Sequence, residues 1–117
     1  MIVDDNEDAA ESLAVLLRLE GQEVRVAFNG PEALELAAVF RPEVVFLDIG
    51  MPGMDGYEVA RRLRALPQLG EVVLVAQTGW GQEEDRRRSR EAGFDQHLVK
   101  PTDPAALRSL LTALQTP

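Results

Sequence analysis

Residues 44–56, "VVFLDIGMPGMDG", begin with four apolar residues, reach an acid at Asp48, and continue into a turn rich in glycine and proline. A short, continuously apolar run bounded by turn residues is typical of a strand that is covered on both faces of a parallel sheet. A carboxylate at the edge of a core loses hydration, which costs on the order of several kcal/mol unless a cation or hydrogen-bond donors compensate. This stretch therefore predicts a buried strand with a polar site at its carboxyl end.

Short β-rich runs and helical patterns alternate along the whole chain. The predicted strands cover residues 1–3, 23–27, 44–47, 72–76 and 97–99. The predicted helices lie in the stretches 9–21, 30–40, 81–93 and 103–114. Such alternation implies parallel strands, right-handed crossovers and helices on both faces of one sheet. We therefore expect an α/β fold with three layers, in which the alternating run 23–27 forms an edge strand.

Length and composition limit the classes of function. The 117 residues fit one domain, and the net charge of −8 disfavours binding to nucleic acid or to anionic lipid. The chain has no cysteine and no apolar run near the length of about 20 residues that a membrane span needs, so we expect a soluble, cytoplasmic protein. The first strand has only three residues before Asp4, which suggests a chain trimmed at its start or excised from a larger protein.

Polar residues follow the predicted strands at the edge where an open α/β sheet binds its ligands. They are Asp4, Asp5, Asp48, Thr78 and Lys100. Carboxylates gathered at one edge repel one another by about 4 kcal/mol per close pair at an effective dielectric constant near 20, and a divalent cation relieves that repulsion. Because the ligands are oxygens, without histidine or cysteine, Mg²⁺ is favoured. The lysine and the threonine supply a charge and a donor for a phosphoryl group.

Four stretches of the sequence resemble the receiver domain of two-component response regulators: "VDDNED", "LDIGMPGMDGYEVARRLR", "QTGWG" and "HLVKP". The resemblance covers residues 1–117 and is strongest to chemotaxis-regulator-like receivers and to the receiver segments of hybrid sensor histidine kinases. It implies a flavodoxin-like (βα)5 fold with strand order 2-1-3-4-5. It also implies that Asp48 takes a phosphoryl group from the phosphohistidine of a histidine kinase or phosphotransfer domain. Thr78 is then expected to hydrogen-bond this group and Lys100 to pair with it.

The same resemblance implies a Mg²⁺ site. Asp5 and Asp48 are expected to bind the ion directly, Asp4 through a water molecule, and Gly50 through its carbonyl oxygen. Each residue also has a simpler interpretation, because Asp4 and Asp5 could form an acidic helix start, and Asp48 could begin a turn. Their expected meeting at one edge favours the functional interpretation.

An alternative function is a Mg²⁺-dependent phosphatase or phosphotransferase that uses Asp48 as its catalytic nucleophile. Such enzymes need a second acid near the nucleophile and a cap over the substrate, and neither is evident in the sequence. We therefore expect a signalling domain rather than an enzyme.

The predicted route of the signal to a partner uses residues 82–92, 97–99 and 103–114, which are expected to form one face for a downstream protein or a second copy. The segment 81–93 contains four arginines and little apolar surface, so its helix is expected to be weakly anchored. His97 stands where receiver domains often have an aromatic residue, and Trp80 follows Thr78 at a distance of two residues. His97 is interpreted either as a switching residue or as a half-exposed strand residue.

Overall fold

The computed structural model describes the chain except for residues 52, 79–86, 88–89, 101 and 116–117. Its strands are β1 (Ile2–Val3), β2 (Val26–Ala27), β3 (Val44–Asp48), β4 (Val73–Thr78) and β5 (Gln96–Val99). Its helices are α1 (Glu7–Leu19), α2 (Gly30–Phe40), α3 (Gly56–Ala65) and α5 (Pro104–Gln115), with a short 3₁₀ helix at Pro67–Leu69. None of the helices in these described parts is long and apolar enough to cross a membrane.

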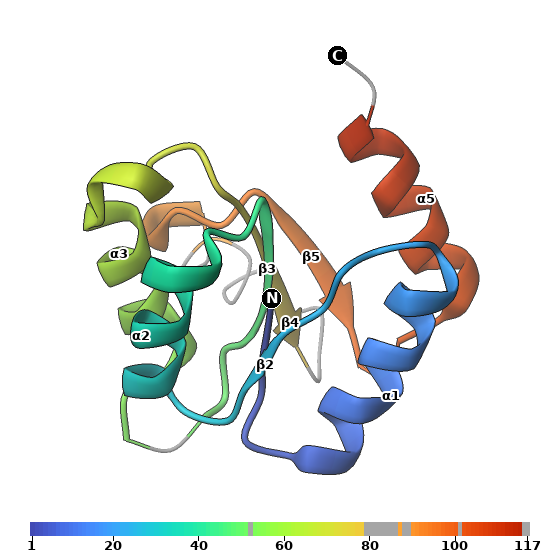
Figure 1. Ribbon diagram of the computed structural model, residues 1–117, viewed down its shortest axis with the longest axis horizontal. Helices are drawn as coiled ribbons and strands as arrows, with labels where there is room; N and C mark the ends of the chain where they lie inside the picture. Colours follow the sequence, from blue (N-terminus) through green and yellow to red (C-terminus); the bar gives the residue numbers. More distant parts are fainter. Residues whose placement is uncertain (52, 79–86, 88–89, 101, 116–117) are drawn as a thin grey trace.

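The strands form one parallel sheet in the order β2-β1-β3-β4-β5, and helices cover both faces (Figure 1). Helices α2 and α3 lie on one face, and α1 and α5 lie on the other. The register pairs Ile2 with Val26 on one side and with Phe46 on the other. The flavodoxin-like fold, the strand order and the edge position of β2 are therefore confirmed.

Two apolar clusters fill the spaces between the sheet and its helices. On one face, Leu47 and Leu74 of the sheet pack with Val59 and Leu63 of α3. On the other face, Phe46 and Val75 belong to a cluster with side chains of α1 and α5, such as Leu13 and Leu107. Because neighbouring residues of β3 and β4 are buried on opposite faces, these strands are apolar throughout, as the sequence predicted.

Side-chain caps fix the starts of the helices. Asn6 begins α1 by accepting a hydrogen bond from the Ala9 N–H, and Asn29 begins α2 in the same way. Asp55 accepts from the Glu58 N–H and so caps α3; it is a helix cap rather than the turn residue that its place in a glycine-rich loop suggests. Such caps satisfy N–H groups that have no partner within the helix. The start of α3 is thereby fixed close to the end of β3.

Two strands, β2 and β4, differ from their predicted bounds, because pairing with a neighbouring strand determines how far each extends. β2 has two residues instead of the predicted five, because its neighbour β1 offers only Ile2 and Val3 for pairing. β4 extends to Thr78, which pairs with Val99 in register, so Thr78 ends the strand instead of following it. The predicted helix at 81–93 lies mostly outside the described residues, although 87 and 90–92 are helical.

Arg64 ties three chain segments together at the amino ends of β4 and β5. Its guanidinium donates to the Gly93 carbonyl at 2.7 Å, to the Gly70 carbonyl at 3.1 Å and to the Val72 carbonyl, and it pairs with Asp95 at 2.8 Å. The same Asp95 oxygen accepts from the Leu74 N–H. This hub joins α3 to the starts of both strands.

We expect Arg64→Met to lower the free energy of unfolding by about 1–3 kcal/mol, because it leaves the partly buried carbonyls of Gly93 and Val72 without this donor and removes the ion pair with Asp95. Urea unfolding measures the loss. Arg61→Met is the matched control on the same helix, since within the described part of the chain Arg61 forms an exposed pair with Glu58, worth about 0.5 kcal/mol or less, and no further ion pair. If both substitutions lowered the free energy of unfolding equally, the contacts of Arg64 would not stabilise the fold more than an exposed ion pair does.

Candidate functional site

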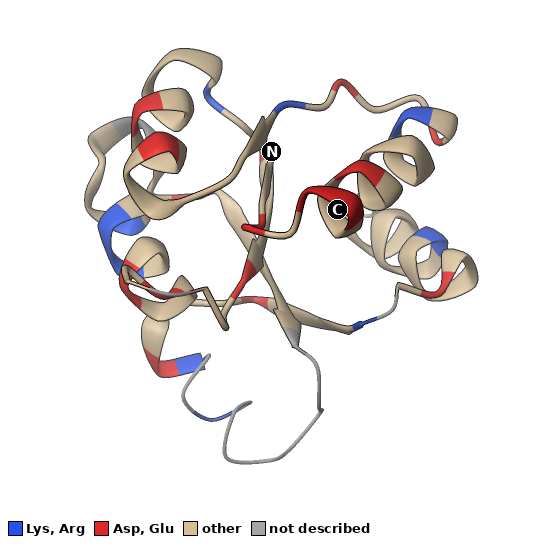
Figure 2. Cartoon of the chain, turned by 90° about the horizontal axis from the view of Figure 1, so that it is seen from below, with Lys and Arg blue, Asp and Glu red and all other residues tan. Residues whose placement is uncertain are grey.

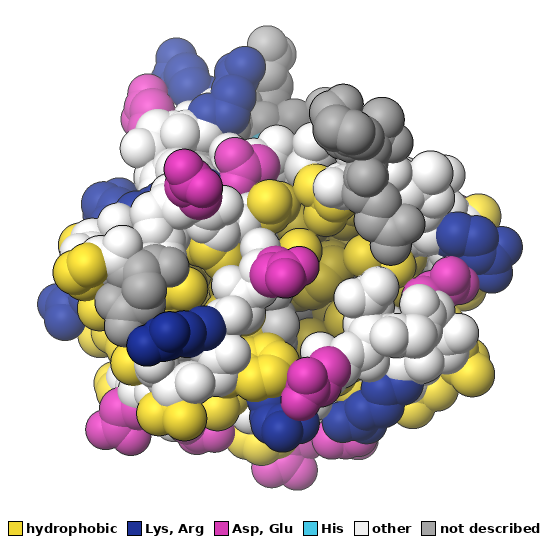
Figure 3. Space-filling view, turned by 45° about the horizontal axis from the view of Figure 1, so that its top comes forward, with side chains coloured by type: hydrophobic (Ala, Val, Ile, Leu, Met, Phe, Trp, Pro, Cys, Tyr) yellow, Lys and Arg dark blue, Asp and Glu magenta, His cyan; other side chains and the backbone are white. Residues whose placement is uncertain are grey.

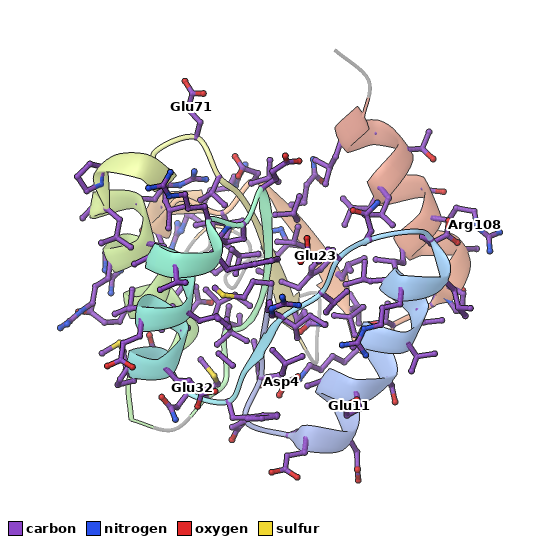
Figure 4. The ribbon with its side chains drawn as sticks, in the orientation of Figure 1. Asp4, Glu11, Glu23, Glu32, Glu71 and Arg108 are labelled. Atoms are coloured by element: carbon purple, nitrogen blue, oxygen red, sulfur yellow. The ribbon has the colours of Figure 1, made fainter. Side chains whose placement is uncertain are left out.

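The sheet brings three of the predicted polar positions to one edge. Asp4 follows β1, Asp48 ends β3, and Lys100 follows β5. Because β1 lies beside β3 and all strands run parallel, their carboxyl ends meet on the same side of the molecule. Figure 2 views the molecule from this side and shows acidic residues around it. Figure 4 places Asp4 near the start of α1, at the end of the sheet opposite Glu71.

Three carboxylates form a compact acidic cluster. One carboxylate oxygen from each of Asp4, Asp5 and Asp48 lies within 4.8 Å of the others. Asp4 is only 1% exposed, Asp48 is partly buried, and Asp5 is exposed. These positions agree with the predicted meeting of the three acids. So close a group of acids, one of them buried, needs a counter-charge.

Lys100 provides a counter-charge within the chain. Its Nζ lies 2.8 Å from Asp4 Oδ2 and 3.3 Å from Asp48 Oδ2. Burial alone would lower the pKa of this ammonium, but the hydrogen bond to Asp4 and the charges of Asp48 and Asp4 outweigh it and raise the pKa. Lys100 is therefore positively charged at neutral pH. Its shorter contact with Asp4 could not be predicted from the sequence.

Backbone N–H groups hold the other oxygens of the two inner acids. Asp4 Oδ1 accepts from the Asn6 N–H at 3.0 Å, and Asp48 Oδ1 accepts from the Gly50 N–H at 2.9 Å. Both bonds reach two residues along the chain, as is common for aspartate at turns. The backbone of Asn6 therefore helps to hold Asp4 in the site, although the position of Asn6 in the sequence indicates only a helix cap. The N–H contact of Gly50 with Asp48 was also not predicted from the sequence.

Gly56 allows α3 to approach the end of β3 closely. A Cβ atom at this position would lie 2.5 Å from the Asp48 carbonyl oxygen and 2.5 Å from Ile49 Cα. Real Cβ atoms do not come so near, so only glycine fits here without a backbone shift. The first residue of α3 thus packs directly behind the backbone of Asp48.

The remaining predicted residues are placed only in part. Thr78 ends β4 at the same sheet edge, but its side chain lies outside what the structure describes, as does Trp80. His97 pairs with Ala76 in the register of β5 and is half-buried, in agreement with its interpretation as a half-exposed strand residue.

A pocket opens at the opposite end of the sheet and contains none of these residues. It has a volume of about 310 Å³, an apolar floor that includes Leu17 and Phe46, and a rim that includes Glu23 and Glu43. Figure 3, with the amino ends of the strands turned forward, shows apolar atoms in a hollow with acidic groups around it. The functional site is therefore marked by the meeting of charged groups at the carboxyl ends of the strands and not by this pocket.

Relatives and solved structures agree with this arrangement. A family model described as the response regulator receiver domain matches residues 1–112. The chain is 40% identical over 114 residues to the transcriptional regulatory protein PrrA of Mycobacterium leprae, covering 97% of this chain and 48% of PrrA. It is 36% identical over 114 residues to the response regulator PleD of Caulobacter vibrioides, covering 97% of this chain and 25% of PleD. The chain thus spans about half the length of one relative and a quarter of the other.

Two solved structures show the same fold. The chemotaxis protein CheY4 of Vibrio cholerae superposes with a TM-score of 0.91 at 29% identity, covering 96% of this chain and 93% of that one. The signal receiver domain of a histidine kinase from Syntrophus aciditrophicus has a TM-score of 0.85 at 33% identity, covering 97% and 86%. With an acidic cluster and a lysine at the carboxyl ends of a 2-1-3-4-5 sheet, the chain belongs to the response regulator receiver domain family.

Proposed function

We propose that Asp48 accepts a phosphoryl group from the phosphohistidine of a partner protein in a Mg²⁺-dependent reaction, and that the domain then changes conformation to signal. One observation carries this proposal. Asp4, Asp5 and Asp48 form a cluster at one sheet edge, a lysine pairs with Asp4 and Asp48, and solvent still reaches the Asp48 carboxylate. A phosphoryl acceptor needs such a nucleophile beside groups that offset negative charge.

The transfer forms one bond and breaks another. An oxygen of the Asp48 carboxylate attacks the phosphorus atom, and a new O–P bond forms as the P–N bond to the imidazole breaks. The bonding electron pair leaves with the imidazole nitrogen, which remains on the partner and takes a proton from water. The product is an acyl phosphate on Asp48, and no oxidant or reductant is needed.

The residues present fit a magnesium ion. The cluster offers only hard oxygen donors, which Mg²⁺ prefers, and it holds more negative charge than one lysine balances. Asp4, Asp5 and Asp48 would hold the ion, together with the Gly50 carbonyl oxygen. When bound, Mg²⁺ neutralises charge on the phosphoryl oxygens and on the attacking carboxylate.

The chain's own residues position the reacting group. The Gly50 N–H fixes one Asp48 oxygen, and the packing of Gly56 behind the backbone fixes the strand end. Lys100 is close enough to Asp48 to pair with an added phosphoryl group, and Thr78, at the end of β4, is proposed to donate a hydrogen bond to it.

We further propose that residues 1–117 act as one receiver domain whose phosphodonor is a histidine kinase or a phosphotransfer domain. The proposed output face includes β5 and α5, which are neighbours of Lys100 along the chain. The rest of this face, residues 82–92, lies largely outside the described residues. A downstream protein or a second copy would bind there.

The direct test of the proposed function is a phosphorylation assay. The protein is incubated with phosphoramidate, a small phosphodonor, in the presence of Mg²⁺ or of a chelator. We expect a mass increment of one phosphoryl group that depends on Mg²⁺ and maps to the peptide containing Asp48. An increment on a different residue, or one that survives chelation unchanged, would refute the proposal.

Magnesium is also expected to stabilise the fold, because a ligand that binds only the native state shifts the unfolding equilibrium. The gain is about 2.7 kcal/mol when free Mg²⁺ is about 100 times Kd. We expect Asp5→Ala to abolish this gain in a thermal melt. Asp8→Ala is the matched control, since it removes one acid from the first turn of α1 but not from the cluster. A melting temperature that does not change on addition of millimolar Mg²⁺ would argue against the metal site.

A further inference from the structure

Gln77 is a buried glutamine in β4, directly before Thr78. In the described part of the chain, Asp4 and Gln77 are the buried side chains that are polar or charged. Asp4 has donors in Lys100 and in the Asn6 N–H, whereas Gln77 Oε1, on a residue that is only 3% exposed, has no hydrogen-bond partner among the described residues. Most buried polar groups have such a partner, and a buried amide without one destabilises the fold. Gln77 is therefore a candidate ligand-binding residue.

The sheet places Gln77 beside Asp48. The two residues are paired in the register of β3 and β4, and neighbouring strands lie about 4.8 Å apart. Side chains alternate between the two faces of a strand, and Phe46 and Val75, each two residues earlier, belong to the cluster with α1 and α5. Asp48 and Gln77 therefore share this face, and the amide is a neighbour of the proposed phosphoryl acceptor.

The other neighbours of Gln77 explain why its amide oxygen lacks a donor. On β5 it is paired with Leu98, which is apolar. The Asp48 carboxylate accepts the Gly50 N–H at Oδ1 and lies 3.3 Å from the Lys100 ammonium at Oδ2, and it has no proton to donate when ionised. A phosphoryl group on Asp48 would add three strong acceptor oxygens beside the amide. The last torsion of a glutamine side chain is broad and two-fold, so the amide can turn over and present its Nε2–H donors instead of Oε1.

We propose that Gln77 binds the phosphoryl group on Asp48 by donating a hydrogen bond from Nε2 to one of its oxygens. This inference rests on the proposed function, since it takes Asp48 to be the acceptor. The hydrogen bond gives the buried amide the partner that it lacks beside an unmodified Asp48. Gln77 thus raises the affinity for the phosphoryl group at the expense of stability in the unphosphorylated domain.

The test measures the affinity for trifluoroberyllate, a mimic of a phosphoryl group on aspartate, by calorimetric titration in saturating Mg²⁺. Gln77→Leu removes the amide and keeps a similar volume, and we expect its Kd for trifluoroberyllate to rise by about tenfold or more, as for the loss of a hydrogen bond to a charged group. Its Kd for Mg²⁺ alone is expected to stay unchanged, because the three acids of the cluster remain.

Gln96→Leu is the matched control. It makes the same chemical change at the first residue of the neighbouring strand β5, where the side chain is exposed. We expect this variant to bind trifluoroberyllate and Mg²⁺ as tightly as the unmodified protein does. A tenfold loss of trifluoroberyllate affinity in this control as well would show a general effect of replacing glutamine and would overturn the inference.

A thermal melt without Mg²⁺ and trifluoroberyllate separates this role from a structural one. We expect Gln77→Leu to raise the melting temperature by a few degrees, because it removes a buried polar group that lacks a partner. A lower melting temperature would show that the amide stabilises the unphosphorylated fold, and the inference would then be wrong.

A nuclear magnetic resonance measurement on the unmodified protein covers the case in which Gln77→Leu does not fold. The side-chain amide protons of Gln77 are assigned through their bonds in protein labelled with ¹⁵N and ¹³C. When trifluoroberyllate and Mg²⁺ are added, we expect one of these protons to shift downfield and to exchange with water several-fold more slowly. Unchanged shifts and exchange rates would refute the hydrogen bond.

The two proposals fail in different ways. Equal affinity of the unmodified protein and of Gln77→Leu for trifluoroberyllate would refute the role of Gln77 and leave Asp48 as the acceptor. Absence of saturable trifluoroberyllate binding in the unmodified protein, together with no phosphoryl increment on Asp48, would refute the proposed function and this inference together.

Discussion

Asp48→Asn is expected to abolish phosphorylation while leaving the fold intact. The amide oxygen is uncharged and a poor nucleophile, so no phosphoryl increment should appear on the peptide that carries residue 48. The side chain keeps its shape, and its oxygen can still accept the Gly50 N–H. Removal of one charge from the cluster also relieves repulsion between the acids, so we expect a melting temperature that is unchanged or slightly higher in the absence of Mg²⁺.

The matched control is Asp103→Asn, which makes the same chemical change at the start of α5. Asp103 accepts the Ala105 N–H there, and asparagine caps helices as well as aspartate does. We expect this variant to be phosphorylated at the normal rate. Phosphorylation of Asp48→Asn at the normal rate on the same peptide would show that Asp48 is not the nucleophile.

The sequence predicts the place of the acidic cluster because strand ends alone determine it. Asp4, Asp48 and Lys100 each directly follow or end an apolar run, and parallel strands bring such positions to one edge. The family resemblance implied the strand order 2-1-3-4-5, and the structure shows the same order. Neither conclusion needs a side-chain conformation.

The details that the sequence could not supply depend on side-chain direction and on contacts between distant segments. Nothing in the spacing of Asp4 and Lys100 indicates that the ammonium lies nearer to Asp4 than to Asp48. Arg64 reaches Gly93, 29 residues away, and only the packed fold decides which of several neighbouring arginines does so. The length of β2 also depends on a contact between distant segments, because β2 extends only as far as β1 offers pairing residues.

Gly56→Ala is expected to destabilise the fold and to slow phosphorylation together. The added methyl group would meet backbone atoms of Asp48 and Ile49 at 2.5 Å, and no flexible side chain can move aside to make room. We expect a loss of about 2–3 kcal/mol in the free energy of unfolding, as for other overpacked positions. Urea unfolding measures this loss, and the rate of labelling by phosphoramidate with Mg²⁺ measures the effect on the site.

Gly70→Ala separates this steric effect from a general effect of replacing glycine. A Cβ atom at position 70 would meet no atom within 4 Å, and the backbone there has φ of −60°, which alanine adopts freely. We expect the stability of this variant to stay within about 0.5 kcal/mol of the unmodified protein, with an unchanged labelling rate. If Gly56→Ala behaved in the same way, the end of β3 would have to tolerate a displaced α3. The close packing behind Asp48 would then not be what positions its carboxylate.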